Sequence, residues 1–116
     1  MTTYVLNTLI IPVDFEKYPK VRAVIRKATL EEVQQLLRNE FVSAVGHEAT
    51  AVLLSQLLGI KIPFNRITVK LKPGDVCVHY VLRTRIPEGK ILSYEELSKL
   101  EYDLAISEIE EVTEND

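Results

Sequence analysis

The chain has 116 residues, 47% of them hydrophobic and 27% charged, which suits one compact domain with a hydrophobic core. Its single cysteine, Cys77, excludes an internal disulfide and a cysteine-rich zinc site, and we expect a small buried apolar residue in a reducing compartment. The net charge of −3 is unevenly distributed: residues 101–116 hold seven acidic and no basic residues, so residues 1–100 carry a net charge of +4. A net charge this small argues against a general duplex-DNA binder.

The first third of the chain predicts two strands, a long loop and a helix. Residues 3–7 and 21–27 are rich in β-prone residues, and the second run alternates between apolar and polar positions. The connection from Asn7 to Tyr18 lacks periodicity and contains Pro12, so we expect a long loop that carries function or covers a site. Thr29 and Glu32 form a capping-box pattern and predict a helix that ends near Asn39.

The middle of the chain predicts a second helix and a hairpin. The helix begins at Gly46 or His47 and ends at Leu58, and Gly59 provides a C-terminal signal. Its expected buried stripe consists of Val52, Leu53, Leu57 and Leu54. Two β-prone runs, 66–71 and 76–85, flank the type II turn signal Lys72-Pro73-Gly74-Asp75 and predict an antiparallel hairpin, in which Val76, Val78, Tyr80 and Leu82 face the core.

The last third predicts a short helix and a final strand. Ser93 and Glu96 form another capping-box pattern, which opens a helix through about Leu100. Residues 102–112 alternate imperfectly and predict a strand, and 113–116 form an acidic tail. The fold class expected is therefore α/β or α+β: one domain over residues 1–112, with a small mixed sheet of about five strands flanked by helices. No run approaches the roughly 20 apolar residues that span a bilayer, so we expect no membrane partner.

The segment Ser43–Ala51 is the strongest chemical signal. It places His47 after Gly46 at the expected start of a helix, where free N–H groups and the helix dipole favour an anion such as phosphate. A histidine can donate or accept a proton near neutral pH, Gly46 allows close approach of a ligand, and Thr50 can form hydrogen bonds. Taken alone, a histidine at this position is more often one that caps the helix or packs at the surface.

Arg85, Glu88 and Gly89 form a second candidate group, on a turn after a strand. A guanidinium group binds two phosphate oxygens at once, and Glu88 suits a ribose hydroxyl or the support of Arg85. A surface ion pair on a turn would look the same. The polar candidates Asn7, Asn65 and Arg66 are uninformative alone, and a structural role is the better interpretation for His79.

Several chemical motifs are missing from the sequence. No P-loop, dinucleotide-binding glycine motif or metal-ligand spacing occurs, and no glycine-flanked serine begins a catalytic triad. An enzyme with this sequence is therefore expected to use no cofactor and no metal.

Taken together, these segments resemble the viral ring nucleases, which are anti-CRISPR proteins that degrade the cyclic tetra-adenylate messenger of type III systems. The Gly-His helix start and the Arg-x-x-Glu-Gly-Lys turn carry the resemblance best, and it covers nearly the whole chain. The matching segments are Tyr4–Asn7, Ser43–Ala51, Leu58–Ile60, Asn65–Ile67, Gly74–Asp75, Arg85–Leu92 and Glu95–Leu97. The chain looks most like a member from an archaeal virus, and host cytoplasm is the location implied.

The resemblance implies a metal-independent homodimer that holds the ring between its subunits. A ribose 2′-hydroxyl would attack the neighbouring phosphorus and leave linear products with a 2′,3′-cyclic phosphate, thereby suppressing type III immunity. It implies His47, Arg85 and Glu88 as catalytic residues, with His47 the general acid and the loop 8–18 a lid. The ligand-binding residues expected are Asn7, Gly46, Thr50, Asn65, Arg66 and Gly89.

Two other functions fit the sequence. One is a viral DNA-binding regulator without catalysis, which predicts duplex affinity that falls steeply with salt. The other is a protein that sequesters a cyclic nucleotide without cleaving it, and only turnover separates it from a ring nuclease.

Overall fold

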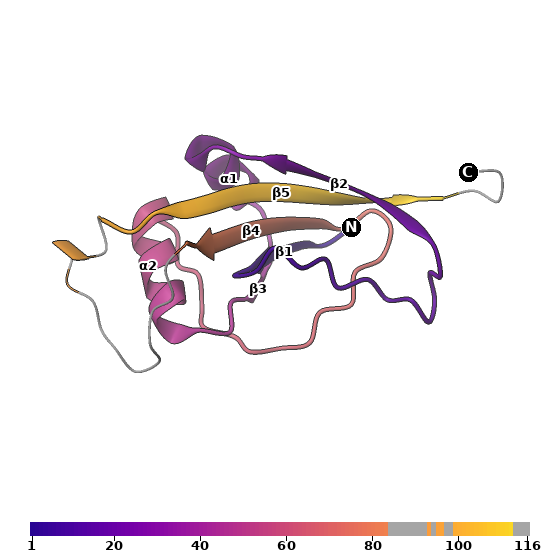
Figure 1. Cartoon of the computed structure of the whole chain (residues 1–116), viewed down its shortest axis with the longest axis horizontal. Helices are drawn as coiled ribbons and strands as arrows, with labels where there is room; N and C mark the ends of the chain where they lie inside the picture. Colours follow the sequence, from indigo (N-terminus) through magenta and orange to yellow (C-terminus); the bar gives the residue numbers. More distant parts are fainter. Residues whose placement is uncertain (84–92, 94, 97–98, 113–116) are drawn as a thin grey trace.

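The computed structural model describes residues 1–83, 93, 95–96 and 99–112 of the chain (Figure 1). Within these residues it contains five strands and two helices. The strands are β1 (Thr3–Leu6), β2 (Val21–Lys27), β3 (Val42–Ala44), β4 (Val76–Leu82) and β5 (Tyr102–Glu111), and the helices are α1 (Leu30–Leu36) and α2 (Glu48–Leu58).

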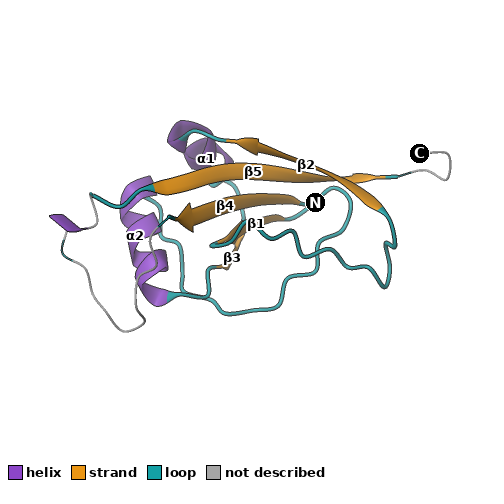
Figure 2. Ribbon diagram, viewed as in Figure 1, coloured by secondary structure: helices purple, strands orange, loops and turns teal. Residues whose placement is uncertain are grey.

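The five strands form one mixed sheet in the order β2-β5-β4-β1-β3. β1 is parallel to both of its neighbours, β3 and β4, whereas β5 is antiparallel to β4 and β2. The arrowheads of β1 and β4 point toward α2, which stands at that end of the sheet (Figure 2). The expected mixed sheet of about five strands with helices, an α+β fold, is confirmed.

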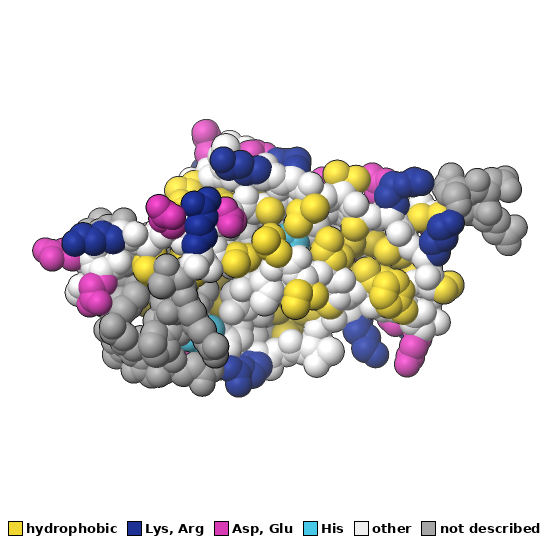
Figure 3. All heavy atoms as spheres, viewed as in Figure 1, with side chains coloured by type: hydrophobic (Ala, Val, Ile, Leu, Met, Phe, Trp, Pro, Cys, Tyr) yellow, Lys and Arg dark blue, Asp and Glu magenta, His cyan; other side chains and the backbone are white. Residues whose placement is uncertain are grey.

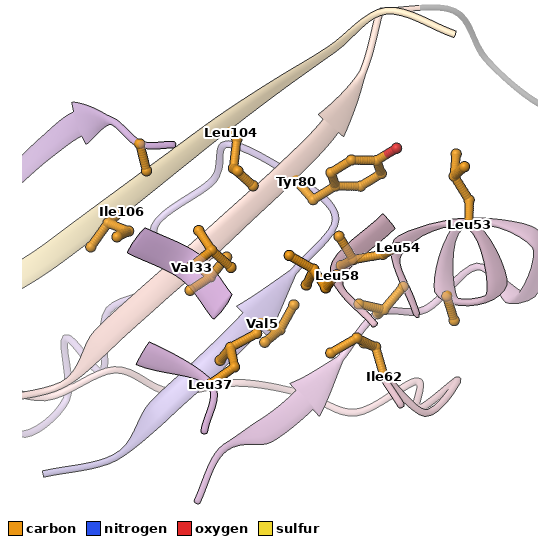
Figure 4. Close-up of a cluster of buried hydrophobic side chains, with 14 residues drawn as sticks. Val5, Val33, Leu37, Leu53, Leu54, Leu58, Ile62, Tyr80, Leu104 and Ile106 are labelled. Atoms are coloured by element: carbon orange, nitrogen blue, oxygen red, sulfur yellow. The ribbon is translucent and has the colours of Figure 1, made fainter. Parts of the chain in front are cut away.

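The two helices cover one face of the sheet and form the larger core with it (Figure 4). Val5, Val78 and Leu104 come from three neighbouring strands, and Val33 of α1 and Leu54 of α2 pack against them. All five side chains are at least 95% buried. The face of β4 that was expected to meet the core does so, because Val78 and Tyr80 are buried there.

The opposite face of the sheet is covered by two long connections, residues 7–20 and 59–75, rather than by helices. Val69 and Leu71 pack there against Leu6, Cys77 and Ile109. The connection after β1 joins the same layer, since Val13 forms a parallel bridge with Leu71. Cys77 is fully buried, as expected of a small apolar residue.

The local helix signals are confirmed in detail. The Thr29 hydroxyl accepts from the Glu32 N–H at 3.2 Å, and the Glu32 carboxylate accepts from the Thr29 N–H at 3.1 Å. Gly59 ends α2 in the left-handed conformation with φ of 68°. Helix α1 ends at Leu36 and not near Asn39. Ser93 and Glu96 exchange the same pair of capping hydrogen bonds at 3.2 Å each, although the extent of that helix lies outside the described residues.

The predicted hairpin of 66–71 with 76–85 is wrong. The turn between the runs forms, with Gly74 at φ of 95° and the Asp75 N–H donating to the Lys72 carbonyl at 3.1 Å. Residues 66–71, however, lie across the sheet rather than beside β4, and the Leu71 N–H donates to the Pro12 carbonyl at 2.8 Å. Burial of alternate side chains is satisfied equally by an extended segment that lies on a sheet, so alternation alone could not separate the two.

Two further details differ from the sequence expectation. Val52 is 52% exposed, whereas Leu53, Leu54 and Leu58 are buried, because Val52 lies almost opposite Leu54 on a helix with 3.6 residues per turn. Strand β3 was not predicted, since three residues are too few to show a period. No helix of the described residues is long and apolar enough to cross a membrane. The tail 113–116 lies outside these residues.

Candidate functional site

The carboxyl ends of the parallel strands β1 and β3 bring the candidate residues together. The two strands are paired to their last residues, with Leu6 opposite Ala44, so the segments that follow leave the sheet side by side. One segment begins with Asn7 and the other contains Gly46 and His47. This end of parallel strands is where open α/β sheets generally bind ligands.

His47 is the N-cap of α2, with an extended backbone at φ of −133° and ψ of 118°. Its ring nitrogen Nδ1 accepts a hydrogen bond from the Thr50 N–H at 3.3 Å, and the Thr50 hydroxyl lies 3.1 Å from the same nitrogen. The other ring nitrogen, Nε2, is buried and finds no hydrogen-bond partner within the described residues. A buried polar atom without a partner costs about 1–3 kcal/mol, so this nitrogen stands out among the polar atoms of the described residues.

The peptide groups of Gly46 are held from both sides. The Asn7 side-chain oxygen accepts from the Gly46 N–H at 3.4 Å. Arg66 donates from Nε at 3.2 Å and from Nη2 at 2.9 Å to the Gly46 carbonyl. Asn7 and Arg66, predicted from distant parts of the sequence, thus meet one glycine directly before His47.

Asn65 stabilises the backbone turn that leads from β3 to His47. Its amide donates to the Ser43 carbonyl at 2.7 Å, and its backbone N–H donates to the Val45 carbonyl at 2.9 Å. The Ser43 hydroxyl in turn donates to the Pro63 carbonyl at 2.6 Å. These bonds clamp residues 63–65 along β3 and its continuation, so Asn65 fixes the shape of the turn that presents His47.

Six of the nine predicted site residues therefore belong to one cluster. They are Asn7, Gly46, His47, Thr50, Asn65 and Arg66. The other three, Arg85, Glu88 and Gly89, lie outside the described residues. Glu48 is exposed, and the His47 ring contacts Thr50 instead. The catalytic and binding roles of all nine residues stay predictions.

His79 has the structural surroundings expected of it. It is fully buried, and its Nδ1 lies 2.7 Å from the Thr8 carbonyl, which can only accept, so Nδ1 carries the proton. Nε2 then accepts from the Ser107 hydroxyl at 2.7 Å. Burial lowers the pKa of His79 below its ordinary value, because the charged ring would lose its hydration.

The same histidine ties down the start of the loop after β1. His79 fixes Thr8, and farther along the loop the Asp14 N–H donates to the Leu71 carbonyl at 2.9 Å. Asn7, which contacts Gly46, is the residue before Thr8. The proposed lid role of residues 8–18 stays a prediction, and these bonds attach Thr8 to β4 and Asp14 to the segment that lies across the sheet.

A hollow of about 670 Å³, which was not predicted, lies at the same end of the sheet beside β2 and β5. The charged residues of its lining are Arg26, Lys27, Arg83 and Asp103, and Leu9 of the loop lines it as well. Arg83 donates to Asp103 at 2.9 Å and to Glu101 at 3.3 Å. The sequence feature that could have indicated this hollow was the basic end of β4. Among the described residues, no group of histidine, cysteine and carboxylate side chains could hold a metal ion.

The fold and this cluster define a class of small α+β protein with a polar site at the carboxyl ends of parallel strands. Residues 3–104 match the family described as STIV B116-like. The structure is similar to B116 of Sulfolobus turreted icosahedral virus, with a TM-score of 0.72, 24% identity and coverage of 92% of this chain and 98% of that one. At that identity the likeness shows the shared fold.

Sequence relatives support the same assignment. Uncharacterized protein 26 of Sulfolobus islandicus filamentous virus is 40% identical over 108 residues, which cover 91% of this chain and 90% of the relative. Uncharacterized protein ORF117 of Acidianus two-tailed virus is 37% identical over 105 residues, 87% of each chain. YddF of Bacillus subtilis is 37% identical over 79 residues, which cover 66% of this chain and 73% of that protein. The chain belongs to the STIV B116-like family, and the expected kinship with archaeal virus proteins is confirmed.

Proposed function

We propose that this protein is a metal-independent ring nuclease that cleaves cyclic tetra-adenylate and thereby suppresses type III CRISPR immunity in the host cytoplasm. The observation that carries the proposal is the setting of His47. Its Nε2 is buried without a partner among the described residues, His47 caps the amino end of a helix, and Arg66 bonds to the carbonyl of the preceding Gly46. Phosphodiester cleavage requires a proton donor next to a position that binds phosphate.

The reaction begins within the ligand. A ribose 2′-oxygen forms a bond to the adjacent phosphorus, and its proton passes to solvent water. The bond from phosphorus to the 5′-oxygen breaks, its electron pair goes to that oxygen, and a proton from Nε2 of the His47 cation neutralises it. The products are linear adenylates with a 2′,3′-cyclic phosphate, and no metal takes part.

The surrounding groups would stabilise the transition state. Arg66 is already turned toward the Gly46 carbonyl, so its guanidinium lies next to the helix start, where a phosphate would sit. N–H groups at the start of α2 add partial positive charge. Arg85 and Glu88 are proposed to complete the site, Arg85 on the phosphate and Glu88 on a ribose hydroxyl or on Arg85.

A homodimer would present these groups to both halves of the ring, because cyclic tetra-adenylate has approximate two-fold symmetry. Large apolar side chains support an interface between copies. Figure 3 shows hydrophobic side chains gathered across the middle of one face. The two long connections expose Leu9, Ile10, Phe15, Phe64 and Ile67 by 44–67% each. Light scattering after size-exclusion chromatography is expected to give the mass of two chains.

The direct test is incubation with cyclic tetra-adenylate, with and without EDTA, followed by chromatography of the products. Linear products ending in 2′,3′-cyclic phosphate are expected at equal rates in both samples. Loss of cleavage in EDTA would contradict the metal-independent mechanism, and absence of cleavage in both samples would contradict the activity.

The matched variant is His47→Asn. Asparagine is a good N-cap, so this change removes the proton donor and keeps the start of α2. Turnover is expected to fall by about 100- to 10,000-fold, as for loss of a general acid, while ligand binding measured by calorimetry persists. Rapid cleavage by His47→Asn would exclude His47 as the acid.

A further inference from the structure

Thr50 directs two polar groups, its backbone N–H and its hydroxyl, at one ring nitrogen of His47. The backbone nitrogen lies 3.3 Å from Nδ1, and the hydroxyl oxygen lies 3.1 Å from it. The backbone N–H can only donate, whereas a hydroxyl can donate or accept. One residue thus offers Nδ1 a fixed donor and a reversible partner.

The fixed donor, the Thr50 N–H, determines which nitrogen of the neutral His47 ring carries the proton. Since Nδ1 must supply a lone pair to the Thr50 N–H, the ring proton resides on Nε2. Nε2 is the buried atom that has no partner within the described residues. The resting ring therefore presents N–H, and not a lone pair, toward the place where a ligand would bind.

The reversible partner, the Thr50 hydroxyl, is needed as a hydrogen-bond acceptor when the His47 ring is a cation. Both ring nitrogens then carry protons, and Nδ1 cannot accept from the Thr50 N–H. The Thr50 hydroxyl at 3.1 Å can accept the Nδ1 proton with little movement of the ring. After Nε2 gives its proton to the leaving oxygen, the remaining proton is on Nδ1 and still has this acceptor.

We propose that Thr50 is the positioning residue of His47: its N–H fixes the Nε2–H form of the resting ring, and its hydroxyl holds the Nδ1 proton when the ring is charged. The part that concerns turnover rests on the proposed ring nuclease activity. The part that concerns the ring's proton does not. Thr50 is 94% buried, so solvent does not easily replace its hydroxyl.

NMR of the ¹⁵N-labelled protein tests the resting state without any turnover. The chain has two histidines, and the structure gives them opposite proton positions: Nε2–H for His47 and Nδ1–H for His79. Long-range ¹H–¹⁵N spectra at a pH of about 8, above the ordinary range of histidine titration, should show both patterns, and His47→Asn assigns them. An Nδ1–H ring at His47 would overturn the proposal.

The hydroxyl is tested by Thr50→Val and Thr50→Ser. Valine keeps the shape and the backbone N–H but removes the acceptor, whereas serine restores it. At acidic pH the Nδ1 proton of the His47 cation should be protected from solvent exchange in the wild type and in Thr50→Ser, and not in Thr50→Val. Equal protection in a folded Thr50→Val protein would overturn the proposed role of the hydroxyl.

Kinetics provide the readout that depends on the activity. For Thr50→Val we expect kcat to fall about tenfold with KM little changed, since in this proposal the Thr50 hydroxyl bonds to the His47 ring and not, as the resemblance implied, to the ligand, and Thr50→Ser should recover. Unchanged kcat in a folded Thr50→Val protein would contradict the proposal. If the wild type cleaves no cyclic tetra-adenylate, the proposed function fails, while the two NMR measurements still decide the role of Thr50.

Discussion

Arg66 closes over the Gly46 carbonyl with two hydrogen bonds, from Nε at 3.2 Å and from Nη2 at 2.9 Å. The contact joins the long connection after α2 to the peptide directly before His47. It orients the Gly46 peptide and holds a cation beside the start of α2. The glycine can be altered without removing the guanidinium, so the two contributions to the site can be separated.

Gly46→Ala should reduce turnover of cyclic tetra-adenylate without destabilising the fold. A Cβ at this position would lie 3.6 Å from the nearest Arg66 atoms, an ordinary contact, and the backbone φ is not positive. The free energy of unfolding should therefore stay within about 0.5 kcal/mol of the wild type. The added methyl group would occupy space that the proposed ligand needs. Urea unfolding and cleavage assays measure the two effects.

Gly59→Ala is the matched control for that experiment. A Cβ added at Gly59 would meet no atom within 4 Å, but the backbone φ of 68° strains any residue with a side chain. We expect a loss of stability of about 1–2 kcal/mol with cleavage preserved at temperatures where the protein stays folded. If Gly46→Ala and Gly59→Ala both kept full activity, the close approach of ligand at Gly46 would be contradicted.

The capping role of His47 can be separated from its proposed chemistry. His47→Ala loses the bond from the Thr50 N–H to Nδ1, and should destabilise the protein by about 1 kcal/mol. His47→Asn retains a cap and should unfold at nearly the wild-type urea concentration. Equal stability of the alanine variant and the wild type would show that the N-cap bond contributes nothing in solution.

The parts of the fold that could be predicted from sequence are those with local signals. The capping box of Thr29 with Glu32 and the C-cap at Gly59 involve only residues that are near one another in the sequence. Their patterns are therefore visible without knowledge of the tertiary fold. Val52 was misplaced because it was grouped with the leucines by its apolar character, although 3.6 residues per turn put it on the polar side of α2, among Glu48, Ser55 and Gln56. The run 66–71 was misplaced because its partner is the loop at Pro12–Asp14, and no local rule pairs the two.

The contacts of the candidate site likewise fall into two groups: those that local sequence rules predict, and those that depend on the tertiary fold. The contact of Thr50 with His47 spans three residues of a helix start and follows from capping rules. The approach of Asn7 to Gly46 depends on parallel pairing of β1 with β3, and β3 was not predicted. Two residues that are 39 positions apart leave no sign of their contact in a single sequence, so this meeting required the structure.

Cys77 should be inert toward thiol reagents in the folded protein. Burial raises the pKa of its thiol to about 11, because the thiolate would lose its hydration, and the thiolate is the reactive form. A disulfide reagent at a pH of about 8 should label the chain slowly in buffer and rapidly in urea, with one thiol per chain. Equal rates in the two conditions would contradict the burial of β4 in the centre of the sheet.

His79 should make the stability of the protein depend on pH. An unfolded histidine titrates at about 6.5, and burial holds the pKa of folded His79 below that value. The unfolded chain therefore binds more protons below about pH 6.5, so stability is complete above that pH and falls as the pH is lowered, by at most about 1.4 kcal/mol per pH unit. Urea unfolding measured from about pH 7.5 to 5.5 tests this, above the range where carboxylates titrate.

The control for this slope is His47→Asn, which leaves His79 as the only histidine in the chain. The slope should persist in that variant, because it comes from the burial of His79, which lowers the pKa of its ring. A proton added to Nε2 would end its acceptance from the Ser107 hydroxyl and leave a buried cation, while Nδ1 would still donate to the Thr8 carbonyl. Stability that stays flat over the same pH range would contradict a neutral, buried His79.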